Sequence, residues 1–194
     1  MWAPANPLML RAGLPDSREQ GRAYLRSVTA GAMPDDEVEW YLATCADLVG
    51  RLDAETRVDY RPLPRPDYHL AADGSVTGRG LDHAPYDASS VPGLPEALRP
   101  PTYLPLLTMA ERDALAGSTP DPALLAGRAA EGVRTMGGAL VAALVHSALD
   151  RGVLLTAGAR VTALEPAGGG WDVVVGESAH ILATDVVLPS GGFE

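Results

Sequence analysis

Residues 183–194 read ATDVVLPSGGFE, and the interpretation of the whole chain starts from this stretch. Residues 185–188 form a continuous, mainly apolar run, which is typical of a strand that is buried on both of its faces. The run leads through Pro189 into Ser190, Gly191 and Gly192. Because glycine lets the backbone approach a ligand closely, the stretch predicts a buried strand that ends in a ligand-binding corner. A plain turn at the end of a strand is the alternative.

The residues before this stretch predict a helix followed by a β-meander. Residues 128–151 carry apolar side chains at helical spacing, and Gly152 is expected to end that helix. Four runs then have the length and composition of strands: residues 153–156, 160–165, 171–175 and 181–188. The second and third runs are joined by an Ala-Gly-Gly-Gly segment, which predicts a hairpin.

The first part of the chain, residues 1–57, is expected to be helical. Asp16 and Ser17 offer helix N-cap chemistry, and Pro34 followed by three acidic residues indicates a second helix that ends near Arg51. Residues 58–127 contain eleven prolines and predict a long ordered excursion with one short helix near residues 108–116. Together with residues 128–194, these parts predict an α/β fold, or an α+β fold if the chain is a fragment, in one incomplete domain.

Composition excludes several classes of protein and of chemistry. The net charge is −10 and no basic face is evident, so a nucleic-acid partner is not expected. The chain has no lysine, which excludes a Schiff-base lysine and a P-loop lysine. The four histidines show no metal-binding spacing, so no metal site is expected. No apolar run approaches the roughly 20 residues of a membrane span, and the expected location is the cytoplasm.

Two single residues have specific expected roles. Cys45 is the only cysteine, which excludes an internal disulfide, and its part-apolar helical surroundings predict a packing role and not a reactive thiol. Arg79, in a Thr-Gly-Arg sequence, is expected to anchor a loop or to clamp a carboxylate.

Two sets of residues resemble a known family. Residues 137–140, 150–155 and 160–164, followed by the closing Ser-Gly-Gly-Phe-Glu, are similar to the part of a fumarate-reductase-type flavoprotein that completes its FAD domain. The second set follows the order seen in 3-ketosteroid dehydrogenases: residues 2–6, 16–17, 23–25, 66–69, 77–79 and 85–87. The chain therefore resembles the 3-ketosteroid dehydrogenase and fumarate reductase flavoprotein family over nearly its whole length.

The resemblance implies FAD as the cofactor, held in a Rossmann-like domain that this chain forms only in part. No G-x-G-x-x-G sequence is present to seat the pyrophosphate, so the missing remainder of the flavoprotein is an expected partner. By resemblance, residues 58–127 line the substrate side, and Ser190, Gly191 and Gly192 lie against FAD. Val161 lies on the strand that passes the adenine, with an ordinary core valine as the alternative.

The resemblance also implies a reaction. Tyr68, in a Pro-Asp-Tyr sequence, matches a tyrosine that lines the substrate pocket and assists the removal of a proton beside a ketone. A phenol can do this only where its proton moves along a relay or its anion is stabilised. The alternative is a tyrosine that anchors a proline-rich loop by packing and one hydrogen bond.

The expected activity is FAD-dependent dehydrogenation of a ketone-bearing small molecule, with a 3-ketosteroid as the leading candidate. Reduction of an unsaturated acid such as fumarate is the alternative within the family, and it predicts an arginine and histidine pair for the carboxylates. An alternative of another class is an inactive fragment, or a docking partner of the missing portion.

Overall fold

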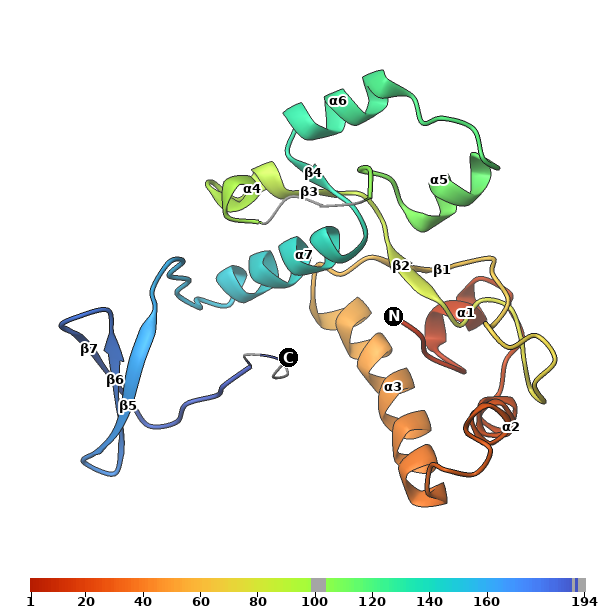
Figure 1. Cartoon of the computed structure of the whole chain (residues 1–194), viewed down its shortest axis with the longest axis horizontal. Coiled ribbons are helices and arrows are strands. Elements are labelled where there is room, and N and C mark those ends of the chain that lie inside the picture. The colour runs from red at the N-terminus through yellow and green to blue at the C-terminus, as the bar shows by residue number, and fades with distance from the viewer. Residues whose placement is uncertain (99–103, 190, 192–194) are drawn as a thin grey trace. The chain divides into compact units, whose positions relative to one another are not determined.

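The computed structural model describes residues 1–98, 104–189 and 191, which divide into two units (Figure 1). The first unit comprises residues 1–153 and the second residues 154–194. Ser190 and Gly192, two of the residues expected near FAD, lie outside the described residues. Each strand pair between the named strands is antiparallel. The chain therefore has a mixed helix and sheet structure, and its place in a Rossmann-like domain stays a prediction.

Three helices begin the first unit: α1 (Pro7–Arg11), α2 (Arg18–Thr29) and α3 (Asp35–Glu55). The predicted start of α2 is confirmed, because the Ser17 side chain accepts a hydrogen bond from the Gln20 N–H at 3.1 Å. The predicted start of α3 after Pro34 is also confirmed, and the helix runs four residues beyond the expected end at Arg51. The sequence analysis did not predict α1, which Asn6 caps by accepting two backbone N–H bonds.

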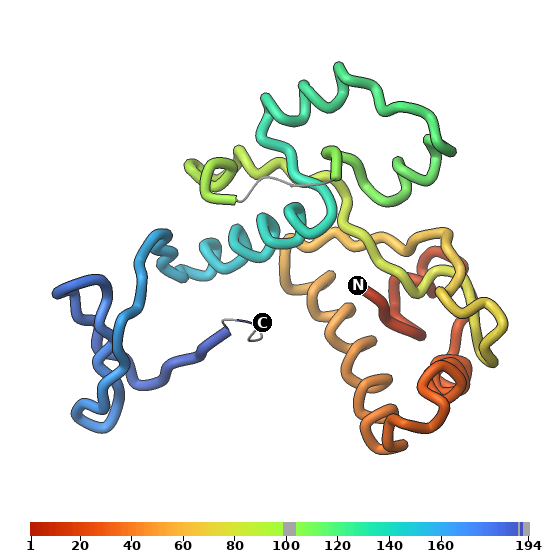
Figure 2. Tube along the Cα trace, in the orientation of Figure 1, coloured from red at the N-terminus to blue at the C-terminus, as the bar shows by residue number. Residues whose placement is uncertain are grey.

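A small antiparallel sheet holds the N-terminus against the middle of the first unit. Strand β1 (Tyr60–Pro62) pairs with β2 (Leu81–His83), and the first residues of the chain run along the free side of β2 (Figure 2). The Leu81 N–H donates to the Met1 carbonyl at 2.7 Å, and the Ala3 N–H donates to the Arg79 carbonyl at 3.0 Å. The largest buried cluster joins this sheet to the helices: Ala3, Leu8, Cys45, Val49, Val58, Tyr60, Leu81 and Ala143.

Short elements complete the first unit: β3 (Tyr86–Asp87), η1 (Ala88–Ser90), α4 (Leu94–Ala97), α5 (Met109–Ala114), α6 (Pro122–Ala130), β4 (Val133–Arg134) and α7 (Met136–Asp150). The short helix expected near residues 108–116 is confirmed as α5, but the expectation of a single helix within residues 58–127 is wrong, because α4 and the start of α6 also lie there. The single helix expected over residues 128–151 is wrong in its first part. Gly132 and Met136 adopt left-handed backbone conformations, with φ of +72° and +50°. These angles interrupt the helix, and β4 forms between them and pairs with β3.

Cys45 has the packing role that its sequence context predicted. Its side chain lies in the main buried cluster of the first unit, and burial raises the pKa of its thiol. Across the described part of the chain, no helix combines the length and the apolar character that a membrane crossing requires.

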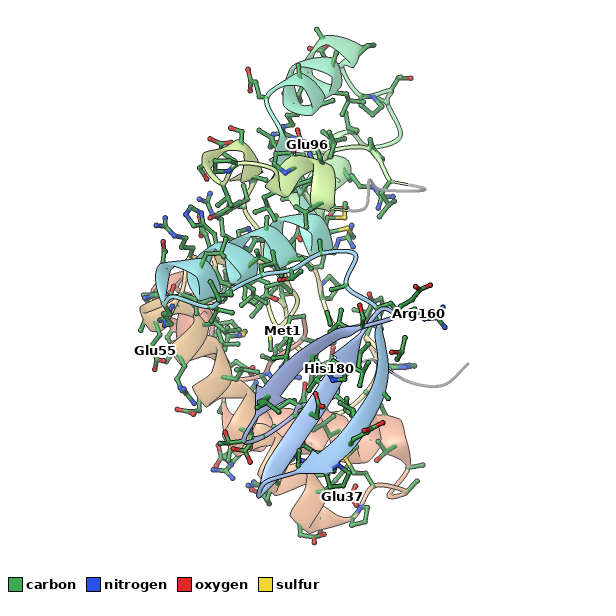
Figure 3. All side chains as sticks on the ribbon, turned by 90° about the vertical axis from the view of Figure 1, so that its left-hand side faces the viewer. Met1, Glu37, Glu55, Glu96, Arg160 and His180 are labelled. Carbon is green, nitrogen blue, oxygen red and sulfur yellow. The ribbon has the colours of Figure 1, made fainter. Side chains whose placement is uncertain are left out.

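The second unit is a three-stranded meander of β5 (Val161–Ala167), β6 (Gly170–Val175) and β7 (Ala179–Ala183). Figure 3 shows its side chains, with His180 labelled on β7. The predicted hairpin between β5 and β6 is confirmed. Its two-residue turn uses Gly168 and Gly169 at φ of +57° and +90°, the pair of left-handed residues that such a turn needs.

One predicted strand is absent, and the last one is shorter than expected. Residues 153–156 form no strand, and the last predicted strand ends at Ala183, so residues 184–188 are irregular. Val187 and Leu188, expected to be buried on both faces, are 83% and 69% exposed. A strand buried on both faces needs paired neighbours and covering layers, and the described residues place no strand beside this run.

Gly74 provides a test of the packing of the 67–79 segment on α2. Its φ is +73°, and a Cβ built there would lie 2.2 Å from the Gln20 carbonyl oxygen. Gly13 has a similar φ of +70° but open space around a built Cβ. We expect Gly13→Ala to cost about 1–2 kcal/mol, because of its backbone conformation alone, and Gly74→Ala to cost clearly more. Urea denaturation measures both, and equal losses would contradict the packing argument.

Glu111 makes the first unit sensitive to acid. It accepts hydrogen bonds from Arg128 at 2.6 and 2.9 Å and closes the capping box of α5. The hydrogen bond from Arg128 is the main cause that lowers its pKa from 4.5 to about 2. The ion pair therefore stabilises the fold above about pH 4.5, and this contribution is lost as the pH falls through about 2.

We expect the stability of Glu111→Gln to depend less steeply on pH in that window. Urea midpoints measured at several pH values test this expectation. Arg128→Gln removes the same pair from the other side and should reduce the pH dependence similarly. Identical pH dependence in the wild type and in Glu111→Gln would show that the pair does not contribute.

Candidate active site

A cavity of about 380 Å³ opens in the first unit between the N-terminus, the β1–β2 sheet and the beginnings of α5 and α7. Its volume lies within the range of small-molecule sites. Its wall includes Trp2, Arg65, Tyr68, Asp82, Met109 and Met136. Residues that are far apart in the sequence thus meet around one space that a small molecule can enter.

Most of the cavity wall is apolar. Leu63 and Leu81 come from β1 and β2 and their flanks, and Met109 and Met136 come from the first positions of α5 and α7. Met136 reaches the wall from a left-handed backbone conformation, with φ +50°, immediately before Gly137. Such conformations cost free energy and persist where the surroundings hold them. The wall therefore suits an apolar ligand, and methionine side chains can adapt to its shape.

The charged groups of the wall are engaged with other residues. The Nε of Arg65 donates to the Asp113 carboxylate at 2.5 Å, and a second guanidinium nitrogen also binds that carboxylate. This side-chain hydrogen bonding is the main cause that lowers the pKa of Asp113. The Asp82 carboxylate accepts a hydrogen bond from the Met109 N–H at 2.7 Å, which fixes the start of α5 beside the cavity.

Tyr68 differs from these residues because its phenol is available. Its side chain lines the cavity and is 93% exposed. No described residue makes a hydrogen bond to its phenol oxygen. The alternative role as a loop anchor predicted one hydrogen bond from the phenol, and the described residues provide none. An available phenol can donate or accept a hydrogen bond with a bound ligand, and its exposure lets solvent water serve as the proton relay that it needs.

The second unit offers exposed backbone at the positions expected to lie near a nucleotide. Val161 begins β5, an edge strand of the described sheet, and is 50% exposed. The register of β5 against β6 shifts between Val161 and Ala163. Gly191 has a φ of +81°, and a built Cβ would meet open space. The proposal of an open ligand-binding corner is therefore compatible with the one corner residue that the structure describes.

The predicted site residues divide between the two units. Tyr68 lies in the first unit, and Val161 and Gly191 lie in the second. Asp82, Met109 and Met136 were not predicted to line a cavity, although a Thr-Met-Gly-Gly run before an apolar helix was a visible signal. Among the described residues, no group of three or more His, Cys, Asp or Glu side chains could hold a metal ion.

The fold and the match to a known family define the class of this protein. The whole chain, residues 1–194, matches the FAD binding domain family. The chain belongs to that family, and FAD is the cofactor that the family holds. The 3-ketosteroid Δ1-dehydrogenase of Sterolibacterium denitrificans, solved in complex with 1,4-androstadiene-3,17-dione, shares the fold with a TM-score of 0.74. That comparison covers 94% of this chain and 37% of the solved chain, at 22% identity.

Two sequence relatives carry the same name, 3-oxosteroid 1-dehydrogenase. The protein from Rhodococcus opacus is 30% identical over 91 residues, which are 47% of this chain and 18% of the relative. The protein from Mycolicibacterium smegmatis is 24% identical over 103 residues, which are 52% of this chain and 18% of the relative. The alignments thus span less than a fifth of the length of either relative.

The described residues fit part of FAD. Val161 is half exposed at the start of the edge strand β5, and the left-handed Gly191 has open space around it, which lets a ligand approach the main chain. The pyrophosphate is a different case, because the sequence holds no G-x-G-x-x-G run that would place backbone N–H groups at a helix N-terminus. The open positions at Val161 and Gly191 are therefore compatible with part of FAD, and the sequence supplies no such motif for the pyrophosphate.

Proposed function

We propose that this chain is part of an FAD-dependent oxidoreductase that dehydrogenates the carbon–carbon bond beside a ketone, with 3-ketosteroids as the substrate class. The observation that carries the proposal is the available phenol of Tyr68 on the wall of an apolar cavity of about 380 Å³. The names of the relatives support the substrate class. The family supports the cofactor.

The proposed chemistry assigns separate roles to the chain's residues. Removal of two hydrogens from the substrate releases a proton from the carbon beside the ketone and a hydride from the next carbon. Bound FAD would supply the acceptor for this hydride. The exposed Tyr68 phenol relays the proton from the substrate carbon to solvent water, and the apolar wall with Met109 and Met136 orients the ring system. Val161, Ser190, Gly191 and Gly192 are proposed to hold FAD through their backbone groups.

The charge of the cavity wall favours a neutral ketone over a dicarboxylate. A fumarate-like substrate needs cationic groups to hold its carboxylates. Arg65, the arginine of the described wall, is already bound to Asp113. Residues 58–127, which supply much of this wall, are proposed to form the substrate side of the protein.

Trp2 allows a direct test of ligand binding. It lies in the cavity wall, while the other two tryptophans, Trp40 and Trp171, can be replaced by Phe to leave Trp2 as the only indole. We expect 1,4-androstadiene-3,17-dione to quench the Trp2 fluorescence saturably. Met136→Glu places a charge on the apolar wall, and it should weaken this binding by at least about tenfold. Absence of saturable quenching, or equal affinity in the Met136→Glu variant, would contradict the proposed substrate site.

A further inference from the structure

Both residues that flank Tyr68 are held by groups that contact Arg79. On one side, the Asp67 carboxylate accepts a hydrogen bond from Nη1 of Arg79 at 2.8 Å. On the other side, the His69 N–H donates to the Tyr24 phenol at 3.2 Å, and the Tyr24 ring lies 5.4 Å from the guanidinium carbon of Arg79. Arg79 is thus linked to the backbone on either side of Tyr68.

The Arg79 side chain is held in one position by its hydrogen bonds and by burial. It is fully buried, and its remaining described bonds go from Nε and Nη2 to the two carboxylate oxygens of Asp16, at 2.9 and 2.7 Å. The Trp2 ring lies on it at 5.6 Å. Both carboxylates are 1% exposed. A planar guanidinium with a fork of donors can satisfy two carboxylates and stack on aromatic rings at the same time, whereas an ammonium cannot.

Asp67 connects Arg79 to the segment that carries Tyr68. Its Oδ1 accepts a hydrogen bond from Nε1 of Trp2 at 2.7 Å, and its Oδ2 accepts a second bond from the Val76 N–H at 3.1 Å. The Asp67 N–H in turn donates to the Val76 carbonyl at 3.0 Å. The residue before Tyr68 is therefore fixed in both its main chain and its side chain, while the phenol itself stays exposed.

We propose that Arg79 is a positioning residue for Tyr68: it holds the phenol at the cavity wall through Asp67 and Tyr24, without touching the substrate. The inference rests on the proposed function of Tyr68. A misplacement of about 1 Å at a reacting group can cost about 100-fold in rate. Arg79 acts through its charge and through the planar set of donors on its guanidinium group. Lysine keeps the charge but lacks that set of donors, so Arg79→Lys should not hold Tyr68 in position.

The first test needs no catalysis and uses amide hydrogen exchange of the whole chain. In Arg79→Lys, we expect the His69 and Val76 amides to exchange at least about tenfold faster, while the α3 amides keep their protection. Arg128→Lys is the matched control, because Arg128 is also largely buried, bonds to Glu111 and the Leu106 carbonyl, and contacts neither flank of Tyr68. Unchanged exchange at His69 and Val76 in Arg79→Lys would overturn the inference.

The second test is a double-mutant cycle on dehydrogenation of a 3-ketosteroid by the FAD-loaded protein. We expect Arg79→Lys to lower kcat by about 10- to 100-fold with little change in KM. Adding Tyr68→Phe to Arg79→Lys should then cost far less than Tyr68→Phe costs alone. Additive losses would overturn the positioning role and leave the role of Tyr68 intact. An unchanged rate of dehydrogenation in Tyr68→Phe would instead overturn the proposed function. The hydrogen-exchange measurement would still test whether Arg79 holds the segment around Tyr68. If Arg79→Lys does not fold, Asp67→Asn removes the charge of one link and takes its place in both tests.

Discussion

Replacement of Tyr68 by Phe is expected to slow the dehydrogenation of a 3-ketosteroid by about 100- to 10,000-fold, the usual contribution of a positioned proton-transfer group. The substitution removes one oxygen from a side chain that is 93% exposed, so neither core packing nor a described hydrogen bond is lost. Stopped-flow absorbance of the flavin during its reduction measures the step directly. Steroid binding, followed by Trp2 fluorescence, should change only a few-fold.

Tyr86→Phe makes the same chemical change at a phenol with a different task. The Tyr86 hydroxyl lies 2.7 Å from Nδ1 of His146, within the first unit and outside the wall of the cavity. Its removal should leave the rate of dehydrogenation nearly unchanged. If both variants slowed the reaction equally, the effect would be a general consequence of losing a hydroxyl, and Tyr68 would have no specific role in proton transfer.

Arg79→Met is expected to destabilise the first unit by about 3–5 kcal/mol, because it leaves two buried carboxylates without their cation. Methionine roughly preserves the length of the side chain but cannot donate to Asp16 or Asp67. Urea denaturation followed by tryptophan fluorescence measures the loss. Domains of this size are stabilised by only about 5–15 kcal/mol, so the variant is expected to be close to unfolding at 37 °C.

An exposed ion pair gives the matching control. Arg61 pairs with Asp59 at 2.9 Å, and its side chain is 70% exposed. Arg61→Met should cause a far smaller loss, since water screens such pairs and solvates the partner that remains. Comparable losses in the two variants would show that the burial of the Arg79 cluster does not decide its contribution. In that case the positioning role of Arg79 would lose its structural basis.

Helices α2, α3 and α5 could be predicted because their ends carry local chemistry, whereas α1 and α6, capped in the same way by Asn6 and Asp121, were missed. Ser17 and Thr108 accept hydrogen bonds from their own first turns, and acidic residues follow Pro34 in the first turn of α3. These signals depend on neighbours in the sequence, so they can be read directly. The break before α7 could not be predicted in this way. Its apolar spacing continues through Gly132 and Met136, and only pairing of β4 with β3 gives the interruption a stable form.

The run at residues 185–188 shows the limit of composition as a guide. Its residues favour a buried strand, but burial is a property of what surrounds a segment and not of the segment alone. In the structure, Val187 and Leu188 are largely exposed, since the described residues place no strand beside them. The hairpin at Gly168 and Gly169 was predictable, because the left-handed conformation is a requirement of the turn itself.

The candidate site was predictable only in part. Tyr68 and the clamping role of Arg79 came from short motifs, and the structure places Tyr68 in a cavity and Arg79 between two carboxylates. The partners of Arg79 lie 63 and 12 residues away in the sequence, and no spacing rule joins such positions. Met109 and Met136 lie in the apolar wall because the first residues of α5 and α7 lie close together in space. This proximity could not be predicted from the sequence.

The thiol of Cys45 can report local opening of the buried core. It is the only sulfhydryl group in the chain, and it lies at 5% exposure in the cluster that joins α3 to β1 and β2. An aromatic disulfide reagent can therefore react quickly only with molecules in which that cluster has opened. The rate at which the coloured product of the reagent is released then measures how readily the first unit opens under native conditions. The measurement needs no introduced label and no denaturant.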